Sequence, residues 1–214
     1  MFDFISMKII HLQKRVDRLR ECNAELQRIN ISPEGDVYFS AKELPSIGAR
    51  GCSLSHAMAL SEFLFSSDNP FILILEDDFS IRNPSKFWSD IEDAIKNAYL
   101  WDVFLLGYNH AAAIEVTPIE GVFRGINAQT ASGYLVKRGY VPKLIECFFR
   151  SAELLNSFQA LPSPNKEIGF QAACCDMLWK ELQIKDRFWF SIPSQIFQRP
   201  SFSDIEQMQV DYGV

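Results

Sequence analysis

The stretch Pro70-Phe-Ile-Leu-Ile-Leu-Glu-Asp-Asp-Phe79 carries five consecutive apolar residues, 71–75, directly before three acids. A short apolar run between turn signals predicts a strand that is buried on both faces. Glu76, Asp77 and Asp78 then crowd like charges at the end of that strand, and such charges raise one another's pKa unless a positive group lies among them. A divalent cation is the usual remedy, and carboxylate oxygens suit Mg²⁺ or Mn²⁺. The alternative is a solvated acidic turn after the strand.

On either side of this stretch, strand patterns alternate with helix patterns. Apolar runs predict strands at residues 8–12, 37–39, 101–106, 127–136 and 187–192. Helical spacing predicts helices at residues 13–29, 53–65, 84–98, 141–155 and 171–182. In the second helix we expect Leu54, Met58 and Phe65 among the buried residues. This order is typical of an α/β fold, a sandwich with a mostly parallel central sheet flanked by helices. The polar tail near residues 198–205 is expected to lie over the site.

The size and charge of the chain limit its class. It has 214 residues, 48% of them hydrophobic and 22% charged, which is ordinary for one globular domain. Its net charge of −6 argues against a general nucleic-acid binder, whose surface would be basic. No apolar run approaches the ~20 residues that span a bilayer, and residues 1–6 lack the basic flank of a signal peptide. Met7 offers an alternative start, which would make residues 1–6 an upstream extension.

Cysteine usage indicates a reducing compartment. The five cysteines are Cys22, Cys52, Cys147, Cys174 and Cys175. Because the number is odd and no C-x-x-C spacing occurs, we expect free thiols in a cytoplasmic protein, with neither a disulfide framework nor a zinc site. Eighteen phenylalanines are many for one core, and some of them are available for a peripheral contact with a membrane or a partner.

Positive side chains follow the first predicted strand, where open α/β sheets place their ligands. Lys14, Arg15 and Arg18 lie at the start of a predicted helix, and the two arginines are three residues apart, so they share a helical face. Cations at a helix N-terminus oppose the helix dipole. A bound anion such as phosphate therefore explains them better than helix stability does, and the alternative is an ordinary solvated helix start.

Several familiar enzyme motifs are missing. Neither a Walker A sequence nor G-x-G-x-x-G occurs, which argues against a P-loop NTPase or a Rossmann dehydrogenase. Ser53, Ser55 and His56 open the second predicted helix, where one serine is expected to serve as a cap. No acid stands at the spacing of a hydrolase triad, and no G-x-S-x-G elbow occurs. A strand that ends in acids within an α/β domain favours metal-assisted handling of a phosphorylated or nucleotide substrate.

In order and rough spacing, several blocks resemble the motifs of glycosyltransferase family 25, which includes lipooligosaccharide galactosyltransferases and collagen galactosyltransferase domains. The blocks are Ile10-His-Leu-Gln-Lys-Arg-Val-Asp-Arg18, Gly51-Cys-Ser-Leu-Ser-His56, Ile74-Leu-Glu-Asp-Asp78, Trp101-Asp102 with Leu106-Gly107, Ala131-Ser-Gly-Tyr134, Asp176 and Ser203-Asp-Ile205. They span about residues 7–206. The chain departs from the family at His11, where members often have Asn. It also departs before Asp176, where Ala-Ala-Cys-Cys replaces the common Pro-Val.

The resemblance implies a single GT-A-like domain over residues 1–214 that uses a nucleotide sugar, most often UDP-galactose, and inverts the anomeric centre. It implies that Asp78 binds Mn²⁺ or Mg²⁺ directly, with Glu76 as a further metal ligand. Glu76 or Asp77 would hold metal-bound water or the ribose. The other substrate-binding residues that it implies are Arg15 and Arg18, which would grip phosphate or orient the nucleotide, Ser55 and His56 in the nucleotide or donor-sugar pocket, and Ser132 of the Ala-Ser-Gly-Tyr block.

An inverting transfer needs one general base to deprotonate the acceptor hydroxyl. The position of Asp176 in the resemblance makes it the first catalytic candidate, with a helix cap as its alternative role, and Asp204 is the second. As another alternative, Asp204 or Gln198 would complete the metal shell from the tail. The tail, residues 198–214, would then be a lid that orders when nucleotide binds.

The partners that follow from the resemblance are a UDP-sugar donor and a glycan, lipid-linked or protein acceptor, with no nucleic acid. A lipid-linked acceptor would bring the cytoplasmic protein to the inner face of the membrane. Two other classes stay open. One is a nucleotide-sugar hydrolase or a binding-only relative. The other is a Mg²⁺-dependent phosphotransferase, although the usual aspartyl nucleophile motif of such enzymes is missing.

Overall fold

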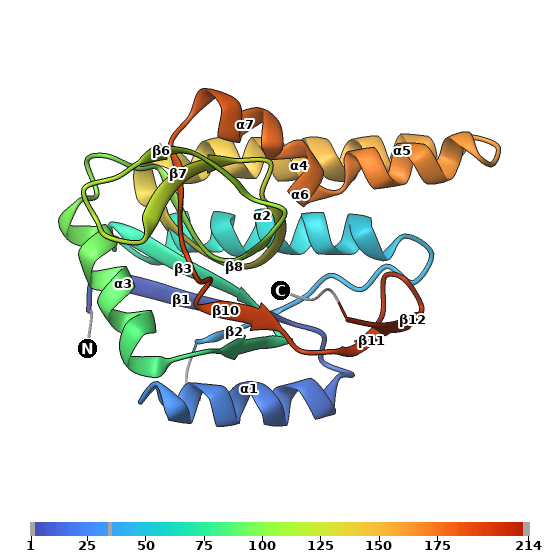
Figure 1. Cartoon of the computed structure of the whole chain (residues 1–214). Helices are drawn as coiled ribbons and strands as arrows, with labels where there is room; N and C mark the ends of the chain where they lie inside the picture. Colours follow the sequence, from blue (N-terminus) through green and yellow to red (C-terminus); the bar gives the residue numbers. More distant parts are fainter. Residues whose placement is uncertain (1–2, 34–35, 212–214) are drawn as a thin grey trace.

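The protein is seen in a computed structural model that describes residues 3–33 and 36–211, and it is built on an eight-stranded sheet (Figure 1). The strand order is β2-β1-β3-β8-β5-β9-β7-β6. These strands are β1 (Ile5–His11), β2 (Tyr38–Ser40), β3 (Phe71–Glu76), β5 (Val103–Asn109), β6 (Ala112–Val116), β7 (Val122–Ile126), β8 (Gln129–Lys137) and β9 (Phe188–Ser191). The long helices are α1 (Val16–Arg28), α2 (Gly48–Ser66), α3 (Pro84–Lys96) and α4 (Val141–Phe158).

The sheet is mixed, but most of its strands share one direction. β1 pairs in parallel with β2 and β3, and β5 pairs in parallel with β9. β8 lies antiparallel between β3 and β5, and β7 lies antiparallel between β9 and β6. Within the described residues, six of the eight strands therefore run the same way, which confirms the predicted α/β fold. The carboxyl ends of β1, β2 and β3 meet at one edge, where such sheets bind ligands.

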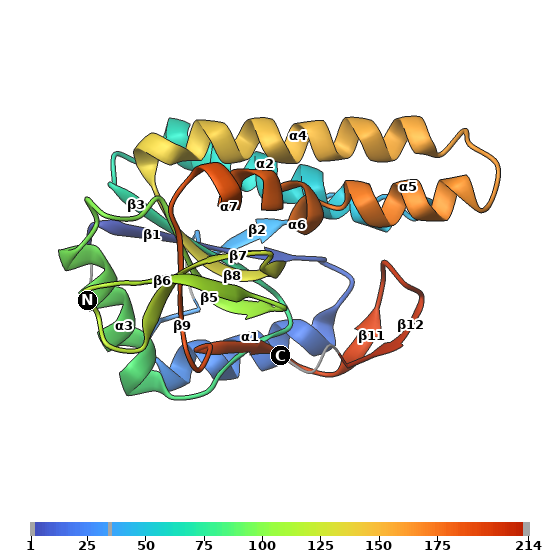
Figure 2. The same cartoon turned by 45° about the horizontal axis from the view of Figure 1, so that its top comes forward.

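β3 is buried on both faces, as its apolar run predicts. Ile72 and Ile74 pack in the core between the sheet and helices α2 and α4. Leu73 and Leu75 pack in a second core on the side of α1 and α3. This alternation follows from the two-residue period of a strand. Figures 1 and 2 show the sheet held between these two helical layers, so the acids after Leu75 emerge between two cores.

Helix α2 begins five residues earlier than predicted and buries a different face. Met58 and Phe65 were expected in the core but are exposed, and Leu54 is only half-buried. The small residues of the helix face inward instead. A Cβ atom on Gly51 would clash with the carbonyl oxygen of Lys42, so the absence of a side chain lets the helix approach the loop after β2 closely.

The predicted helix at residues 171–182 is broken into α5 (Asn165–Ala173), α6 (Cys175–Leu178) and α7 (Lys180–Lys185). Cys174 has an extended conformation, with φ −54° and ψ 147°, which interrupts the helical path. After the break, buried Trp179 donates a hydrogen bond from Nε1 to the carbonyl of Ala128 at 3.0 Å. The break is therefore held in place by tertiary contacts that periodicity alone does not reveal.

The C-terminal tail crosses the edge of the sheet where the acids lie. β10 (Ile196–Gln198) pairs antiparallel with β4 (Phe79–Ile81), and β11 (Ser201–Ser203) forms a hairpin with β12 (Met208–Val210). In both views the hairpin lies beyond one end of α1 (Figures 1 and 2). Residues 212–214 of the predicted tail lie outside the described residues, as do residues 1–2 of the predicted extension. Residues 5 and 6 of that extension belong to β1.

Candidate functional site

The three acids at the carboxyl end of β3 have different surroundings. Asp77 is fully engaged: its Oδ1 accepts a hydrogen bond from Arg18 at 2.7 Å, and its Oδ2 accepts from His11 Nδ1 at 2.9 Å and from the backbone N–H of Leu12 at 3.2 Å. Burial alone would raise the pKa of Asp77, but these hydrogen bonds and the charge of Arg18 hold it below its usual value. Asp77 is therefore an ionised anchor for Arg18.

Asp78 is also buried, but fewer hydrogen bonds and positive groups stabilise its charge. Arg18 lies 3.2 Å from its Oδ2, and Gln198 Nε2 lies 3.4 Å from its Oδ1. Burial raises the pKa of Asp78 to about 7; the charges of Glu76 and Asp77 act in the same direction, whereas Arg18 opposes them. The carboxylate of Asp78 is thus short of positive charge, and a cation would supply it.

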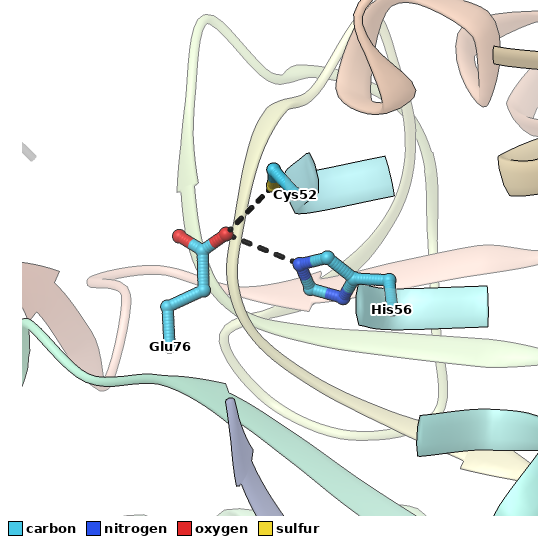
Figure 3. A group of neighbouring side chains, drawn as sticks. All are labelled: Cys52, His56 and Glu76. Atoms are coloured by element: carbon cyan, nitrogen blue, oxygen red, sulfur yellow. Dashed lines mark hydrogen bonds and ion pairs between the residues drawn. The ribbon is translucent and has the colours of Figure 1, made fainter. Parts of the chain in front are cut away.

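Glu76 receives hydrogen bonds from helix α2. Its Oε1 accepts from His56 Nε2 at 3.1 Å and from the thiol of Cys52 at 3.6 Å. Figure 3 shows both side chains directed at the same carboxylate oxygen. His56 is completely buried, and its Nδ1 lies 3.0 Å from the hydroxyl of Tyr134. The other oxygen of Glu76 lies 3.5 Å from Gln198 Nε2.

The hydrogen bonding of Gln198 indicates whether these residues suit a hard cation. Its Nε2 makes only long contacts, to Glu76 and to Asp78, while its Oε1 is buried and has no hydrogen-bond partner among the described residues. Buried polar atoms rarely stay unpaired. A half-turn of the amide would direct Oε1 at the two carboxylates, which is favourable only with a cation between them. Two carboxylates and an amide oxygen are a donor set that Mg²⁺ or Mn²⁺ accepts, so the residues fit the expected metal.

Two cavities meet at these residues. The first has a volume of about 280 Å³ and contains Asp77 and Asp78 in its wall, together with the loop after β2 and the β11–β12 hairpin. The second has a volume of about 200 Å³ and is formed by β8, α6 and the tail. Their common wall consists of Cys52, Glu76, Gln198 and Ile205. The carboxylate of Glu76 therefore separates two adjoining spaces.

Asp176 lies in the wall of the second cavity. Its Oδ2 accepts a hydrogen bond from the backbone N–H of Thr130 at 3.0 Å. Burial raises the pKa of Asp176, and the hydrogen bond from Thr130 opposes this. Thr130 has a φ of 63°, in the left-handed region that β-branched residues rarely adopt. Such backbone strain is typical of functional sites. Here the strained residue, Thr130, is the one whose N–H donates the hydrogen bond to Asp176.

Arg15 is the N-cap residue of α1 rather than part of the helix, whereas Arg18 lies in its first turn, and both side chains reach the tail. Their guanidinium groups donate to the same carbonyl oxygen, that of Phe202, at 2.9 and 3.1 Å. Arg18 also donates to the hydroxyl of Ser201 at 2.7 Å. In the structure the two arginines thus contact the protein's own carboxylates and its tail. These contacts link α1, β3 and the hairpin.

Asp204 fastens the hairpin. Its two oxygens lie 2.8 Å from Lys14 Nζ and 2.8 Å from a terminal nitrogen of Arg15. Burial opposes ionisation, but the hydrogen bonds from Lys14 and Arg15 lower the pKa of Asp204. We refer to these three residues as the tail clamp. Asp204 lines the first cavity, whereas Asp176 lines the second, so the two candidate bases are in different spaces.

The predicted serines are tied to the protein itself. The hydroxyl of Ser55 donates to the carbonyl of Gly51 at 2.7 Å and accepts from the backbone N–H of Lys42 at 2.7 Å, although Ser55 does line the first cavity. Ser132 is fully buried, with its hydroxyl 3.4 Å from that of Thr130. Ser132 and His56 are outside the set of described residues that line the two cavities.

Two residues of the site were not singled out from the sequence. Cys52 occurs only as part of the Gly-Cys motif, and Thr130 has no signal because backbone strain cannot be read from residue type. A signal for Cys52 does exist: it stands four residues before His56, and residues at this spacing share a helical face. The predicted helix began at residue 53, which concealed it.

No protein-family model and no curated protein matches the chain. Among solved structures, it is similar to the mannose-1-phosphate geranyltransferase from Thermus thermophilus, with a TM-score of 0.50 and 10% identity over 87% of this chain and 73% of that one. It also matches A197 from STIV, with a TM-score of 0.46 and 14% identity over 97% and 95% of the two chains. A glycosyltransferase involved in the glycosylation of the major capsid of PBCV-1 matches with a TM-score of 0.46 and 10% identity over 95% and 96%.

The likeness to the Thermus structure concerns the fold alone, and it agrees with the predicted GT-A-like α/β sandwich. The narrower assignment to glycosyltransferase family 25 stays a prediction from the sequence. None of the helices in the described part of the chain is both long and apolar enough to cross a membrane.

Proposed function

We propose that the chain is a metal-dependent glycosyltransferase that moves a sugar from a UDP-sugar to an acceptor hydroxyl with inversion, with UDP-galactose as the first donor to test. The observation that carries this proposal is the wall shared by two cavities, in which Glu76 and Gln198 stand between Asp78 and Asp176. A transfer reaction needs a leaving-group site and an acceptor site that adjoin at one point, and two adjoining cavities lined by these acids support the proposal.

The first cavity suits the nucleotide. Glu76, Asp78 and Gln198 would hold Mn²⁺ or Mg²⁺ at its inner end. When bound, such a cation supplies the positive charge that stabilises the diphosphate leaving group. Lys14 lines the same cavity with a half-exposed side chain and is paired with Glu43 and Asp204. A phosphate would compete for this ammonium group through charge-assisted hydrogen bonds.

The lining of the first cavity is not polar throughout. It includes an apolar set that suits the flat face of a nucleobase, namely Ile10, Leu12, Ala41, Leu44 and Pro45. Ligand pockets commonly combine such apolar walls with a few polar groups that fix orientation. The β11–β12 hairpin closes this cavity on one side through Ser203 and Ile205, so we propose that the tail covers the bound nucleotide as a lid.

The second cavity suits the acceptor, and we assign the general base to Asp176. A carboxylate with a raised pKa is a better proton acceptor near neutral pH than an ordinary one. The Thr130 N–H fixes one of its oxygens and thereby the orientation of the group. Asp204 is the poorer base, because its pKa is lowered by Lys14 and Arg15. In this assignment Asp204 is not the base; its role is to hold the hairpin as part of the tail clamp.

A panel of nucleotide sugars tests the proposal. Purified protein is incubated with UDP-galactose, UDP-glucose, UDP-N-acetylglucosamine or GDP-mannose, with Mn²⁺ or with a chelator, and with a mixture of sugar acceptors. We expect Mn²⁺-dependent release of UDP with formation of a glycosylated acceptor. Asp78→Asn should reduce this by at least ~100-fold, whereas Asp93→Asn, the same change at an exposed acid of α3, should not reduce it.

The panel also separates the alternatives. Release of free sugar that no acceptor diverts would identify a hydrolase. Binding of the nucleotide sugar without turnover would identify a binding-only relative. Turnover that is equal with the chelator, or that survives in Asp78→Asn at the wild-type rate, would contradict the proposed metal site.

A further inference from the structure

Three different metal-ligand groups converge where helix α2 meets β3. Cys52 and His56 lie four residues apart on α2, and Glu76 ends β3. One ligand atom from each, a thiol sulfur, an imidazole nitrogen and a carboxylate oxygen, all lie within 4.8 Å of one another (Figure 3). We propose that Cys52, His56 and Glu76 form a second cation site, selective for a thiophilic divalent ion such as Zn²⁺ and distinct from the hard-cation site at Asp78.

The two distances from the carboxylate oxygen to the other ligand atoms are close to those around zinc. Tetrahedral Zn²⁺ with ordinary Zn–S, Zn–N and Zn–O bonds holds its nitrogen and oxygen ligands about 3.3 Å apart and its sulfur and oxygen ligands about 3.6 Å apart. In the structure, His56 Nε2 lies 3.1 Å and Cys52 Sγ lies 3.6 Å from Glu76 Oε1. An ion could bind with small adjustments of these side chains.

The neighbours of His56 allow it to become a ligand without moving. A ligating Nε2 must lose its hydrogen, which then sits on Nδ1. Nδ1 lies 3.0 Å from the hydroxyl of Tyr134, and a hydroxyl can accept or donate. Tyr134 therefore satisfies either tautomer, as the outer partner of a metal-bound histidine does. Binding of the ion displaces the proton of the Cys52 thiol to solvent, which leaves the thiolate as ligand.

The site is open on one side and supported on the other. His56 is completely buried, whereas Cys52 and Glu76 line both cavities. A fourth coordination position of the bound ion would therefore face these cavities. Gln198 lies 3.5 Å from the second oxygen of Glu76 and leaves the first oxygen to Cys52 and His56. Three protein ligands with one open position are the arrangement of zinc sites that exchange a ligand.

This inference does not depend on the proposed transferase activity, because it concerns a cation bound without nucleotide. The two sites share only Glu76. Variants at Cys52 and at Asp78 should therefore separate them: the first should remove the thiophilic ion, and the second should remove the dependence of UDP binding on Mn²⁺.

Cobalt substitution tests the inference directly. The full chain is stripped with a chelator and titrated with Co²⁺, whose bond to a thiolate gives a charge-transfer band in the near ultraviolet. We expect a band that saturates at about one Co²⁺ per chain and is abolished by equimolar Zn²⁺, as the higher affinity of zinc requires. Circular dichroism confirms that each variant is folded.

The variants identify the ligands. Cys52→Ala should abolish the band, Asp78→Asn should keep it, and Tyr134→Phe should weaken Co²⁺ binding by about 10–100-fold. Cys174→Ala is the matched control, since this thiol also lines the second cavity, and it should keep the band. Cys175→Ala should keep it too. A folded wild-type chain without the band, or a band that persists in Cys52→Ala, would overturn the inference.

Discussion

At the scale of single residues, Arg18 connects the acids to the tail. Its guanidinium contacts Asp77, Asp78, Ser201 and the carbonyl of Phe202. It is nearly buried, as are both aspartates. A buried ion pair contributes little net stability by itself, but removing one partner leaves an uncompensated charge in a medium of low dielectric constant.

We therefore expect Arg18→Met to lower the free energy of unfolding by about 3–5 kcal/mol. Urea denaturation followed by circular dichroism measures this. Arg20→Met, two residues away on the exposed side of α1, is the control and should leave stability nearly unchanged. An Arg18→Met variant as stable as the control would mean that Asp77 and Asp78 do not depend on the guanidinium.

If the proposed metal site is right, Asp78 should make its affinity for the hard cation depend on pH. Its pKa is raised to about 7, so below that pH a proton occupies the carboxylate and competes with the metal. We expect the affinity for Mn²⁺ to rise by about tenfold per pH unit up to about pH 7 and then to level off. Calorimetric titrations between about pH 5.5 and 8 measure it. An affinity that is already constant at the acidic end would contradict the role of Asp78.

The same shift has a consequence for folding in the absence of metal. An acid whose pKa is higher in the folded state binds more protons there than in the unfolded chain, so its contribution to stability is present at low pH. That contribution is lost as pH rises from the ordinary carboxyl range to about 7. A bound cation removes the dependence by favouring the ionised form.

Asp176 is expected to act on turnover rather than on donor binding. Asp176→Asn removes the base but keeps the shape of the side chain, so kcat should fall by about 10²–10⁴-fold. The affinity for UDP in the presence of Mn²⁺ should stay within about twofold, because Asp176 lies in the other cavity. Steady-state kinetics and calorimetry measure the two quantities. A variant with the wild-type kcat would remove Asp176 from the reaction.

At the scale of elements, charged contacts help to hold the β11–β12 hairpin to the body, and its large apolar residues Phe202, Ile205 and Met208 are exposed. The tail clamp joins it to the β1–α1 connection through Lys14 and Arg15, and Arg18 holds the first strand of the hairpin. Segments that bury few apolar side chains open at low free-energy cost. This suits a lid that must admit the nucleotide and then cover it.

Asp204→Asn should loosen the hairpin, because partly exposed ion pairs each contribute about 0.2–1 kcal/mol. We expect thermolysin to cleave within residues 199–211 about 2–10-fold faster than in the wild type, and UDP with Mn²⁺ to restore protection. Asp17→Asn is the control, since it removes another partner of Arg15 without touching the hairpin. Equal cleavage rates in wild type and Asp204→Asn would contradict the clamp.

The elements that could be predicted are those whose pattern is local. β3 is an example: its apolar run and the acids after it fixed both its burial and its place at the site. Helix α2 shows where the pattern fails, because a face of Gly51, Ser55 and Ala59 carries no hydrophobic period. Such small residues are buried by close approach to neighbours, which is a property of the packed molecule rather than of the segment.

The residues of the candidate site also divide into those that a local pattern reveals and those that only the packed molecule reveals. The acids and both arginines were found from residue types and their order, and Asp176 from its position in the resemblance. The three acids, Arg18 and Asp176 line two adjoining cavities, whereas Arg15 lies beside them in the tail clamp. The different roles of Asp77 and Asp78 could not be predicted, because they depend on which carboxylate Arg18 and His11 reach. The absence of C-x-x-C argued against a zinc site, yet Cys52 and His56 acquire a third partner from a distant strand.

At the scale of the whole molecule, the direction of β8 determines where the second cavity lies. β8 runs antiparallel between β3 and β5, so its first residues, including Thr130, lie at the same edge as the end of β3. Periodicity predicts a strand but not the direction in which it pairs. The adjacency of Glu76 and Asp176 is thus a product of topology.

Calorimetric titration of UDP into the metal-free protein, with and without Mn²⁺, measures directly whether the β3 acids bind a metal together with the nucleotide. We expect Mn²⁺ to tighten UDP binding by at least about tenfold, which corresponds to about 1.4 kcal/mol. Asp78→Asn should lose this gain, and Asp93→Asn should keep it. Equal affinity for UDP with and without Mn²⁺ would contradict the assignment of the β3 acids as the leaving-group end of a glycosyltransferase site.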